Sequence, residues 1–281
     1  MAAPELAVVT VSYYSDEVVT TFLGSLSTAS SRPVPCIVVN NAPNDAAIAP
    51  AVAGYENARL VNSATNLGYG KAMNLGVSEA NIADWILLAN PDLTFAPGAL
   101  DELVAIGEKD SSIGVLGPLI YTTGGEIYPS ARRLPSLRHG IGHALFFLVW
   151  KSNPWTKAYL ADRENPPRQR DAGWLSGACL LVRRSAFESV GGFDDKFFMY
   201  FEDVDLCERL GRAGWKVVYA PSAVITHIGG HSTDSQSRTM IKVHHRSAYT
   251  YLSARYSAWY FAPLRIALRF GLWARAYIAK S

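Results

Sequence analysis

Short apolar runs alternate with helix-like segments along the N-terminal part of this 281-residue chain. Turn-forming residues bound each run, which is typical of buried strands. This alternation predicts βαβ units, and therefore an α/β fold with a Rossmann-like, mainly parallel sheet flanked by helices. The expected strands are Leu6–Tyr13, Cys36–Val39, Ala58–Asn62, Trp85–Ala89 and Ile113–Leu119, and the expected helices are Asp16–Ala29, Asp45–Ala53, Gly70–Ala80 and Pro97–Glu108, the last with proline at its first position.

The alternation stops at residues 121–170, which are rich in proline, arginine and aromatic residues and show no clear period. We interpret this stretch as a long loop or lid inserted into one domain of residues 1–231. Residues 232–281 are expected to form a basic, aromatic, helical tail. Between loop and tail, the expected elements are an apolar stretch at Trp174–Val182, helices at Ser185–Val190 and Glu202–Ala213, and separate strands at Lys216–Tyr219 and Ala223–His227.

Composition narrows the class of protein. Hydrophobic residues make up 49% of the chain and charged residues 18%, so a large core can form and a disordered chain is not indicated. The cysteines Cys36, Cys179 and Cys207 are far apart, which indicates neither a disulfide framework nor a zinc site and suits a reducing compartment. The N-terminus is expected to be a strand rather than a signal peptide, and no run reaches the roughly 18 apolar residues of a membrane span.

Charge is unevenly distributed. Residues 129–170 hold eight Lys/Arg and two acids, and residues 232–281 hold eight Lys/Arg and one acid, whereas the rest of the chain is acidic. Local basicity of this kind points to an anionic surface or a polyanionic ligand. Nucleic acid is not the expected partner, because no recognition motif accompanies the basic tail.

The segment Asn90-Pro91-Asp92 directly follows an apolar strand. In open α/β sheets, ligands bind outside the carboxyl ends of the strands, where Tyr13, Asn40 and Asn41 are also expected. A carboxylate at this edge can hold Mg²⁺ or Mn²⁺, which in turn can bridge two phosphates. The alternative is a type I turn without a ligand.

Two further segments carry candidate chemistry. In Phe198–Leu206, an aromatic stretch runs into Glu202 and Asp203, and aromatic surroundings raise the basicity of a carboxylate, as a general base requires. The alternative is an acidic first helical turn favoured by the helix dipole, and Asp205 fits that role better. His227 could complete a metal shell or be structural; His231 is a weaker candidate.

The segment Asn66–Asn74 (NLGYGKAMN) contains two glycines that allow close approach of the backbone to a ligand, although part of it is a helix N-terminal signal. It is neither a dinucleotide-binding GxGxxG nor a Walker A loop. The missing glycine fingerprint argues against a Rossmann oxidoreductase. A glycosidase with paired carboxylates stays open.

Taken in order, seven segments resemble those of glycosyltransferase family 2, the inverting enzymes of the GT-A fold. The resemblance covers about residues 5–231. The segments are VVTVSYYS (8–15), IVVNNAPND (37–45), NLGYGKAMN (66–74), LLANPDLTF (87–95), WLSGACLLVRR (174–184), GGFDDKFFMYFEDVDLCERLGRAGWKVVYAP (191–221) and THIGGH (226–231).

The resemblance implies roles for individual residues. Asp92 matches the last acid of the DXD metal motif, with Asn90 in place of the first acid, and His227 matches a histidine that joins the metal and diphosphate site. Asp203 matches the general base of the ED motif, and Glu202 its partner. The implied donor-binding residues are Tyr13, Asn40 (usually Asp), Asn66, Gly68, Lys71 and Asn90, and the implied acceptor-side residues are Trp174, Ser176 and Gly177.

Within the family, the NPD variant, the FEDVDLC segment and the basic-aromatic tail are similar to those of rhamnosyltransferases. That likeness implies dTDP-rhamnose as the nucleotide-sugar donor and a polyprenyl-diphosphate-linked GlcNAc as the acceptor, in cell-wall linker synthesis. Mg²⁺ or Mn²⁺ would be the cofactor. Two alternatives stay open: a family member with another donor or acceptor, and a catalytically silent sugar-nucleotide-binding module on the same fold.

Aromatic residues and arginines repeat at helical spacings in Ala254–Ile278. This pattern predicts an interfacial helix on anionic lipid headgroups, which places the protein at the cytoplasmic face of the plasma membrane as a peripheral protein. His143–Trp150 could be a second contact with the bilayer. The alternative is a C-terminal helix that packs on the body with its arginines in water. Homo-oligomer formation is possible and not decided by the sequence.

Overall fold

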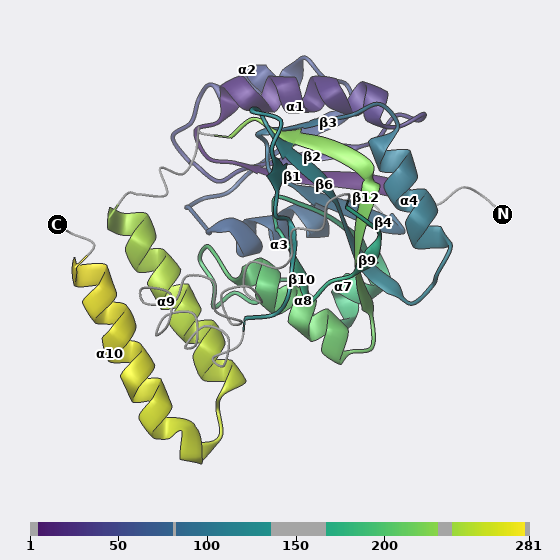
Figure 1. Ribbon diagram of the computed structural model, residues 1–281. Helices are drawn as coiled ribbons and strands as arrows, with labels where there is room; N and C mark the ends of the chain where they lie inside the picture. The colour runs from purple at the N-terminus through teal and green to yellow at the C-terminus, as the bar shows by residue number, and fades with distance from the viewer. Residues whose placement is uncertain (1–4, 81–82, 136–166, 230–237, 279–281) are drawn as a thin grey trace.

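The computed structural model describes residues 5–80, 83–135, 167–229 and 238–278 (Figure 1). Within this part of the chain a large mixed sheet has the strand order β3-β2-β1-β4-β11-β6-β12-β5, and β8 pairs with β10 in a separate small sheet. The strands are β1 Leu6–Ser12, β2 Cys36–Asn40, β3 Ala58–Asn62, β4 Trp85–Ala89, β5 Leu93–Phe95, β6 Ile113–Thr122, β7 Ile127–Tyr128, β8 Ala131–Arg132, β9 Arg170–Asp171, β10 Trp174–Leu175, β11 Cys179–Arg183 and β12 Lys216–His227.

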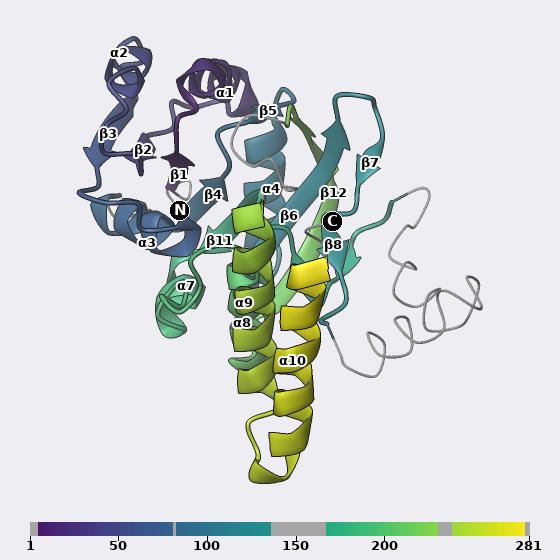
Figure 2. The same ribbon diagram turned by 90° about the vertical axis from the view of Figure 1, so that its left-hand side faces the viewer.

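Helices cover both faces of this sheet, so the predicted α/β class is confirmed (Figures 1 and 2). One core cluster joins the sheet to α1, α2 and α4, and a second joins it to α3, α7 and α8. Gly76 lets α3 lie close to the sheet, because a Cβ there would be 2.3 Å from Val9 Cγ1. The helices are α1 Asp16–Ala29, α2 Ile48–Ala53, α3 Tyr69–Glu79, α4 Ala99–Glu108, α7 Arg184–Ser189, α8 Glu202–Arg212, α9 Arg238–Arg255 and α10 Ala262–Ile278, with a short 3₁₀ turn η1 at Trp259–Phe261.

The strand order reverses at β1, which pairs in parallel with β2 on one side and with β4 on the other. Ser12 is opposite Asn40 in one pairing, and Thr10 is opposite Ala89 in the other. The loops after β1, β2 and β4 therefore leave the sheet at one edge. A reversal of this kind opens a crevice at that edge, where α/β proteins bind ligands.

Two sequence predictions of local structure were wrong. The separate strands expected at Lys216–Tyr219 and Ala223–His227 are the single strand β12, whose register against β6 shifts between Ala220 and Val224. The shift falls at Pro221, which cannot donate a ladder hydrogen bond. A second error concerns Pro97: α4 begins at Ala99 after Gly98, whose φ of 73° only glycine adopts readily.

The apolar stretch Trp174–Val182, for which the sequence predicted no defined element, contributes to two strands in two different sheets, β10 and β11. Strand β11 is antiparallel to both β4 and β6, so it makes the sheet mixed. The ends of the predicted loop at 121–170 also carry strands, namely β7, β8 and β9, while residues 136–166, including His143–Trp150, lie outside the described residues. The expected loop is thus anchored at both ends on strands.

In the described part of the tail, residues 238–278, α9 and α10 form a hairpin that projects from the body beside α8 (Figure 2). Tyr251 of α9 packs with Phe197 and Val204. The carboxylate of Glu208 on α8 is buried and accepts hydrogen bonds from Tyr251 Oη at 2.5 Å and from Arg255. These contacts fix α9 to α8. No helix in the described ranges is both long and apolar enough to cross a bilayer.

Candidate active site

Asp92 lies in the short turn between β4 and β5, at the sheet edge where the strand order reverses. Two backbone hydrogen bonds hold this turn: Asn90 N donates to Ala178 O at 2.8 Å, and Ile228 N donates to Asp92 O at 2.8 Å. The segments after β4, before β11 and after β12 therefore meet at one point. This explains why residues far apart in the sequence can share a site.

His227 is brought to Asp92 by the pairing of β12 with β5, in which His227 is opposite Leu93. Its Nε2 lies 3.0 Å from Asp92 Oδ2. Asp92 Oδ1 is buried and has no hydrogen-bond partner among the described residues. An unpartnered buried carboxylate oxygen is costly in an apolar setting and is well suited to a cation.

The two residues fit a divalent metal whose coordination is completed by a ligand. Within the described ranges, no cluster of three or more His, Cys, Asp or Glu side chains could hold a metal ion without outside ligands. Mg²⁺ in particular commonly takes one or two protein carboxylates together with substrate phosphates. Asp92 and His227 would supply the protein's share of such a site.

Asp203 is the second residue of α8, and both of its oxygens accept backbone hydrogen bonds. Gly177 N donates to Oδ2 at 2.8 Å, and Val204 N donates to Oδ1 at 2.8 Å. Burial raises the pKa of Asp203, while the hydrogen bond from Gly177 and the positive charge of Arg132 oppose that rise. A carboxylate in this setting is a stronger base than one in water and is fixed in orientation.

Glu202 lies beside it and is buried, and its Oε2 has no hydrogen-bond partner in the described part of the chain. Burial, and then the charge of Asp203, raise the pKa of Glu202 to about 8. The pair therefore retains a proton near neutral pH. We assign that proton to Glu202, because Gly177 N and Val204 N donate to the two oxygens of Asp203 and favour its ionised form, whereas Glu202 Oε2 has no hydrogen-bond partner among the described residues.

The two residues that precede this pair are aromatic and have left-handed backbones: φ is 68° at both Tyr200 and Phe201. Bulky side chains rarely adopt that region, and such strain is concentrated at functional sites. Helix α9 supports the turn, since His244 packs edge-on against both rings and Ser247 Oγ donates to Met199 O at 2.7 Å. The tail thus helps to hold the turn that presents Glu202 and Asp203.

The comparisons with known proteins decide the family at this point. A family model described as "Glycosyltransferase like family 2" matches residues 3–250. The chain belongs to glycosyltransferase family 2. The family 2 resemblance predicted from the ordered motifs is therefore confirmed.

The chain is similar to two proteins named as rhamnosyltransferases. The chain is 44% identical to the N-acetylglucosaminyl-diphospho-decaprenol L-rhamnosyltransferase of Mycobacterium tuberculosis, over 97% of this chain and 92% of that protein. It is 39% identical to the rhamnosyltransferase WbbL of Escherichia coli over 29% of this chain and 31% of that protein. The first similarity covers nearly the whole of both proteins, including the region of the hairpin.

Solved structures support the fold of this family 2 glycosyltransferase. The mannosyltransferase PcManGT from Pyrobaculum calidifontis, in complex with GDP-Man and Mn²⁺, has a TM-score of 0.62 at 14% identity, covering 99% of this chain and 74% of its own. GalNAc-T7, with UDP, GalNAc and Mn²⁺, has a TM-score of 0.61 at 14% identity, covering 96% of this chain and 55% of its own. The fold is GT-A, as predicted.

The predicted donor loop of the transferase is organised by Asn41. Its Oδ1 accepts from Leu67 N at 2.8 Å, and its Nδ2 donates to Asn66 Oδ1 and to Gly68 O, both at 3.1 Å. Gly68 has a φ of 79°, and a Cβ there would be 2.1 Å from Phe198 O, so only glycine fits. This loop therefore packs directly on the segment that leads to Glu202 and Asp203.

Two other predicted donor residues lie at the same edge. Tyr13 follows β1, and its side chain is 41% exposed. Asn40 is buried at the end of β2, where its Nδ2 donates to Asn62 Oδ1 at 3.0 Å and its Oδ1 accepts from Ala42 N at 3.0 Å. Asn40 thus shapes the strand end, while Tyr13 presents a ring to solvent.

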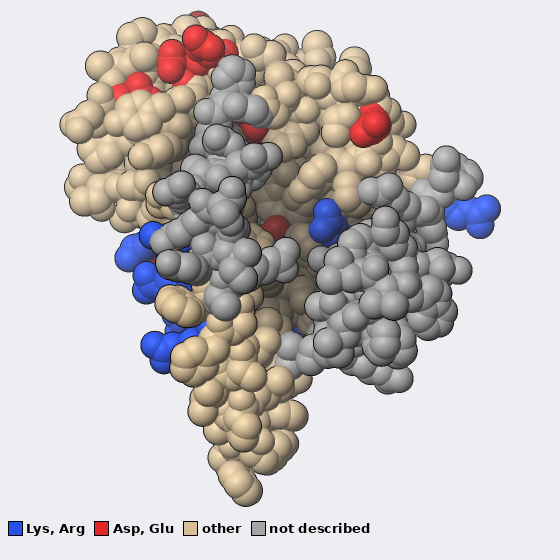
Figure 3. All heavy atoms as spheres, turned by 60° about the vertical axis from the view of Figure 1, so that its left-hand side comes forward, with Lys and Arg blue, Asp and Glu red and all other residues tan. Residues whose placement is uncertain are grey.

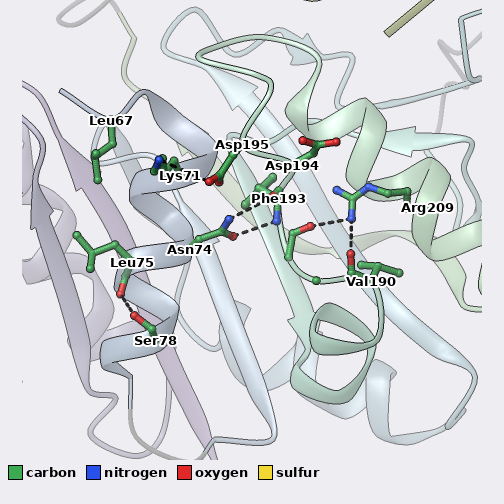
Figure 4. Close-up of a pocket in the computed structure, with 12 residues that line it drawn as sticks. Leu67, Lys71, Asn74, Leu75, Ser78, Val190, Phe193, Asp194, Asp195 and Arg209 are labelled. Carbon is green, nitrogen blue, oxygen red and sulfur yellow. Dashed lines mark hydrogen bonds and ion pairs between the residues drawn. The ribbon is translucent and has the colours of Figure 1, made fainter. Parts of the chain in front are cut away.

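Lys71 is separated from the other predicted site residues. Its Nζ is 3.5 Å from Asp195 Oδ2, and it lines a cleft of about 680 Å³ between α3 and the loop after α7 (Figure 4). Asp92, His227, Glu202 and Asp203 do not line this cleft. Lys71 therefore faces this cleft together with Leu67 of the donor loop.

The predicted acceptor side is a turn between β10 and β11. Trp174 Nε1 donates to Arg133 O at 3.0 Å, and the Arg132 guanidinium lies 5.5 Å from the centre of the Trp174 ring. Ser176 is buried, and its backbone N donates to Ser130 O at 2.7 Å. Figure 3 shows a hollow in one face of the molecule, with acidic atoms at its base and a basic side chain at its rim.

Sequence reasoning did not assign a role to Tyr69 or Arg132. Tyr69 Oη donates to Gly177 O at 2.6 Å, which links the donor loop to the acceptor-side turn. Arg132 lies in β8, opposite Trp174, and its charge acts on Asp203. Tyr69 is part of the NLGYG segment, and Arg132 is part of the basic stretch after residue 129. The sequence therefore marked both segments, but it did not show which residues they contact.

Proposed function

We propose that this transferase moves L-rhamnose from dTDP-rhamnose to a hydroxyl of a polyprenyl-diphosphate-linked GlcNAc, with inversion at the anomeric carbon. The observation that carries the substrate assignment is the 44% identity over 97% of the chain to a relative whose name states that acceptor and that sugar. The site geometry supports the reaction type, because a half-buried base held by backbone hydrogen bonds and a separate carboxylate–histidine pair occupy one edge of the sheet.

In the proposed reaction, Asp203 accepts the proton of the acceptor hydroxyl as that oxygen bonds to the anomeric carbon. The bond from that carbon to the diphosphate oxygen breaks, and the nucleoside diphosphate leaves with the electron pair. The N–H groups of Gly177 and Val204 hold the carboxylate in place for proton transfer. A Mg²⁺ or Mn²⁺ ion held by Asp92 and His227 supplies positive charge beside the departing diphosphate when bound.

The donor is proposed to lie along the reversed strand edge, against Tyr13, Asn40, Asn66, Gly68 and Asn90. Lys71 is left out of this proposal because its ammonium group pairs with Asp195 in the separate cleft. The acceptor sugar is proposed to lie on the turn that holds Trp174, Ser176 and Gly177, since this turn contacts the base directly through Gly177 N.

A donor screen tests the proposal. The protein is incubated with Mg²⁺ or Mn²⁺, a GlcNAc-diphospho-lipid, and in turn dTDP-rhamnose, UDP-GlcNAc, UDP-galactose or GDP-mannose, and the product is followed by mass. We expect a product with dTDP-rhamnose that is lost in Asp203→Asn. Turnover with another donor alone would discard the sugar and keep the mechanism. Metal-dependent nucleotide binding without turnover of any donor would favour a silent binding module.

We also propose that the α9–α10 hairpin rests on the cytoplasmic surface of the plasma membrane. Its turn and α10 expose large apolar side chains: Trp259 is 84% exposed, Phe270 65% and Trp273 67%. Helix α10 contains arginines and no acidic residue. Arg265 Nη1 donates to three carbonyls of residues 256–258, which holds the turn with its aromatic residues outward. Aromatic and cationic side chains on one helix favour an anionic lipid surface.

Vesicle sedimentation tests this second proposal. Replacing Trp259 and Tyr260 with serine is expected to lower binding to anionic vesicles about tenfold or more, because each buried aromatic ring contributes about 1.5–3 kcal/mol. Ile127→Ser, which removes an exposed apolar side chain from β7, is the matched control and should bind as the wild type does. Equal binding by both variants would contradict the proposal.

A further inference from the structure

Tyr69 connects three segments that the proposed function assigns to different tasks. Its backbone N donates to Phe198 O at 2.8 Å, next to the segment that carries the base. Its Oη donates to Gly177 O at 2.6 Å, on the acceptor-side turn. Tyr69 itself is the first residue of α3 and follows the donor loop. A single side chain thus ties the donor loop to the turn that contacts Asp203.

Gly177 connects the Tyr69 hydroxyl to the base Asp203. Its N–H donates to Asp203 Oδ2 at 2.8 Å, while its carbonyl accepts the Tyr69 hydroxyl. A Cβ at Gly177 would lie 3.2 Å from Asp203 Cβ, so the turn and the base are already in close contact. Among the described residues, the Tyr69 hydroxyl is the hydrogen-bond donor that holds the Gly177 carbonyl.

We propose that Tyr69 is a positioning residue for the catalytic base: its hydroxyl fixes the Gly177 backbone, and the Gly177 N–H in turn fixes Asp203. The inference rests on the proposed function, since it needs Asp203 to act as the base. Tyr69 does not take the proton itself, because burial and the nearby carboxylates raise the pKa of its hydroxyl well above the usual range. Phenylalanine at this position therefore removes a hydrogen bond without removing a charge.

The expected consequence is a change in pH dependence. The Gly177 N–H stabilises ionised Asp203, so a looser Gly177 raises the pKa of the base. The other titratable or charged groups that act on this site are Glu202, Asp92, Arg132, Cys179 and Cys207, and Tyr69→Phe leaves all of them in place. The acid limb of kcat against pH should therefore move to higher pH.

The test compares Tyr69→Phe with Tyr55→Phe. Tyr55, which follows α2, is a matched control. Its Oη also donates to a part-buried backbone carbonyl, that of Thr20 on α1, at 2.7 Å. In Tyr69→Phe we expect kcat at pH 7 to fall about threefold to tenfold and the acid limb to move up by about half a unit or more, with KM for both substrates nearly unchanged. Tyr55→Phe should keep the wild-type profile.

Amide hydrogen exchange gives a readout that needs no substrate. The segment that contains Gly177 should exchange faster in Tyr69→Phe than in the wild type or in Tyr55→Phe. A wild-type pH profile together with wild-type exchange in Tyr69→Phe would overturn this inference alone. A raised KM with unchanged kcat would also overturn it, since Tyr69 would then be a substrate contact. Full activity in Asp203→Asn would overturn the proposed base, and this inference with it.

Discussion

Asp92, which is buried, and Asp203, which is half-buried, reach the same edge of the sheet, but their carboxylate oxygens have different partners. Both oxygens of Asp203 accept backbone N–H groups, from Gly177 and Val204. Asp92 has one oxygen beside His227 and one without a partner among the described residues. The first arrangement fixes a carboxylate, and the second leaves one open to a ligand.

This difference separates two tasks that the family motifs assign to similar residues. A base must keep its orientation while it gains a proton. Backbone N–H groups can fix that orientation without the ordering of a second side chain as donor. A metal ligand must offer an oxygen that the protein does not already occupy. The surroundings of each carboxylate, rather than its residue type, thus support the assignment of base and metal ligand. The predictions below test that separation.

The largest expected effect is that of Asp203→Asn. Loss of the base should lower kcat by about 10²–10⁴-fold with little change in KM, because general base catalysis contributes about that factor. Added Mg²⁺ or Mn²⁺ should not restore the rate. The matched control is Asp205→Asn on the same helix, where the carboxylate pairs with Arg209 at 2.6 Å; it should retain most activity. Comparable losses in the two variants would mean that α8 is merely disturbed.

Asp92→Asn should have a smaller effect, of a different kind. Losing one charged contact costs about 3 kcal/mol, so activity at limiting metal should fall on the order of a hundredfold. Raising Mn²⁺ should recover part of the rate, which a metal titration of initial velocity would show. Asp84→Asn is the control, since Asp84 is an exposed carboxylate that precedes β4 at its other end. A loss that no metal concentration relieves would assign Asp92 another role.

Glu202→Gln should change stability most clearly with pH. The pKa of Glu202 rises from 4.5 to about 8 on folding, so between these values the folded chain keeps a proton that the unfolded chain releases. The wild type should therefore lose stability as pH rises from about 4.5 to 8, and the glutamine variant should lose less. Urea unfolding at pH 5 and pH 8 measures this. Glu188→Gln, at a surface carboxylate that is 62% exposed, should follow the wild type.

The α/β class and most element bounds could be predicted from the sequence, because they depend on local patterns, and the same patterns supplied Asp92 and Asp203 as candidates for the metal ligand and the base. Apolar runs mark β1 and β4, and the acids of the NPD and FEDVD segments stand directly at the ends of elements. The sheet order had to come from the structure. That β11 inserts antiparallel between β4 and β6 depends on long-range pairing, which periodicity does not contain.

The contacts between side chains distant in the sequence were the least predictable part of the site. The sequence shows that Lys71 is three residues after Gly68, but not that α3 turns its ammonium group toward Asp195. Likewise, nothing local indicates that the Tyr69 hydroxyl meets Gly177, more than a hundred residues away in the chain. Motifs thus supplied candidate segments for the site, while the tertiary packing decides which side chains of each segment meet.

The buried Glu208 has a consequence for how the enzyme would stand on a membrane. Because Tyr251 and Arg255 bind this carboxylate, α9 is attached to the helix that carries Asp203. A hairpin that rests on lipid would then act as a spacer of fixed length between the bilayer and Asp203. The height of the base above the headgroups would be set by the hairpin, and so would the distance from the lipid at which an acceptor sugar can react.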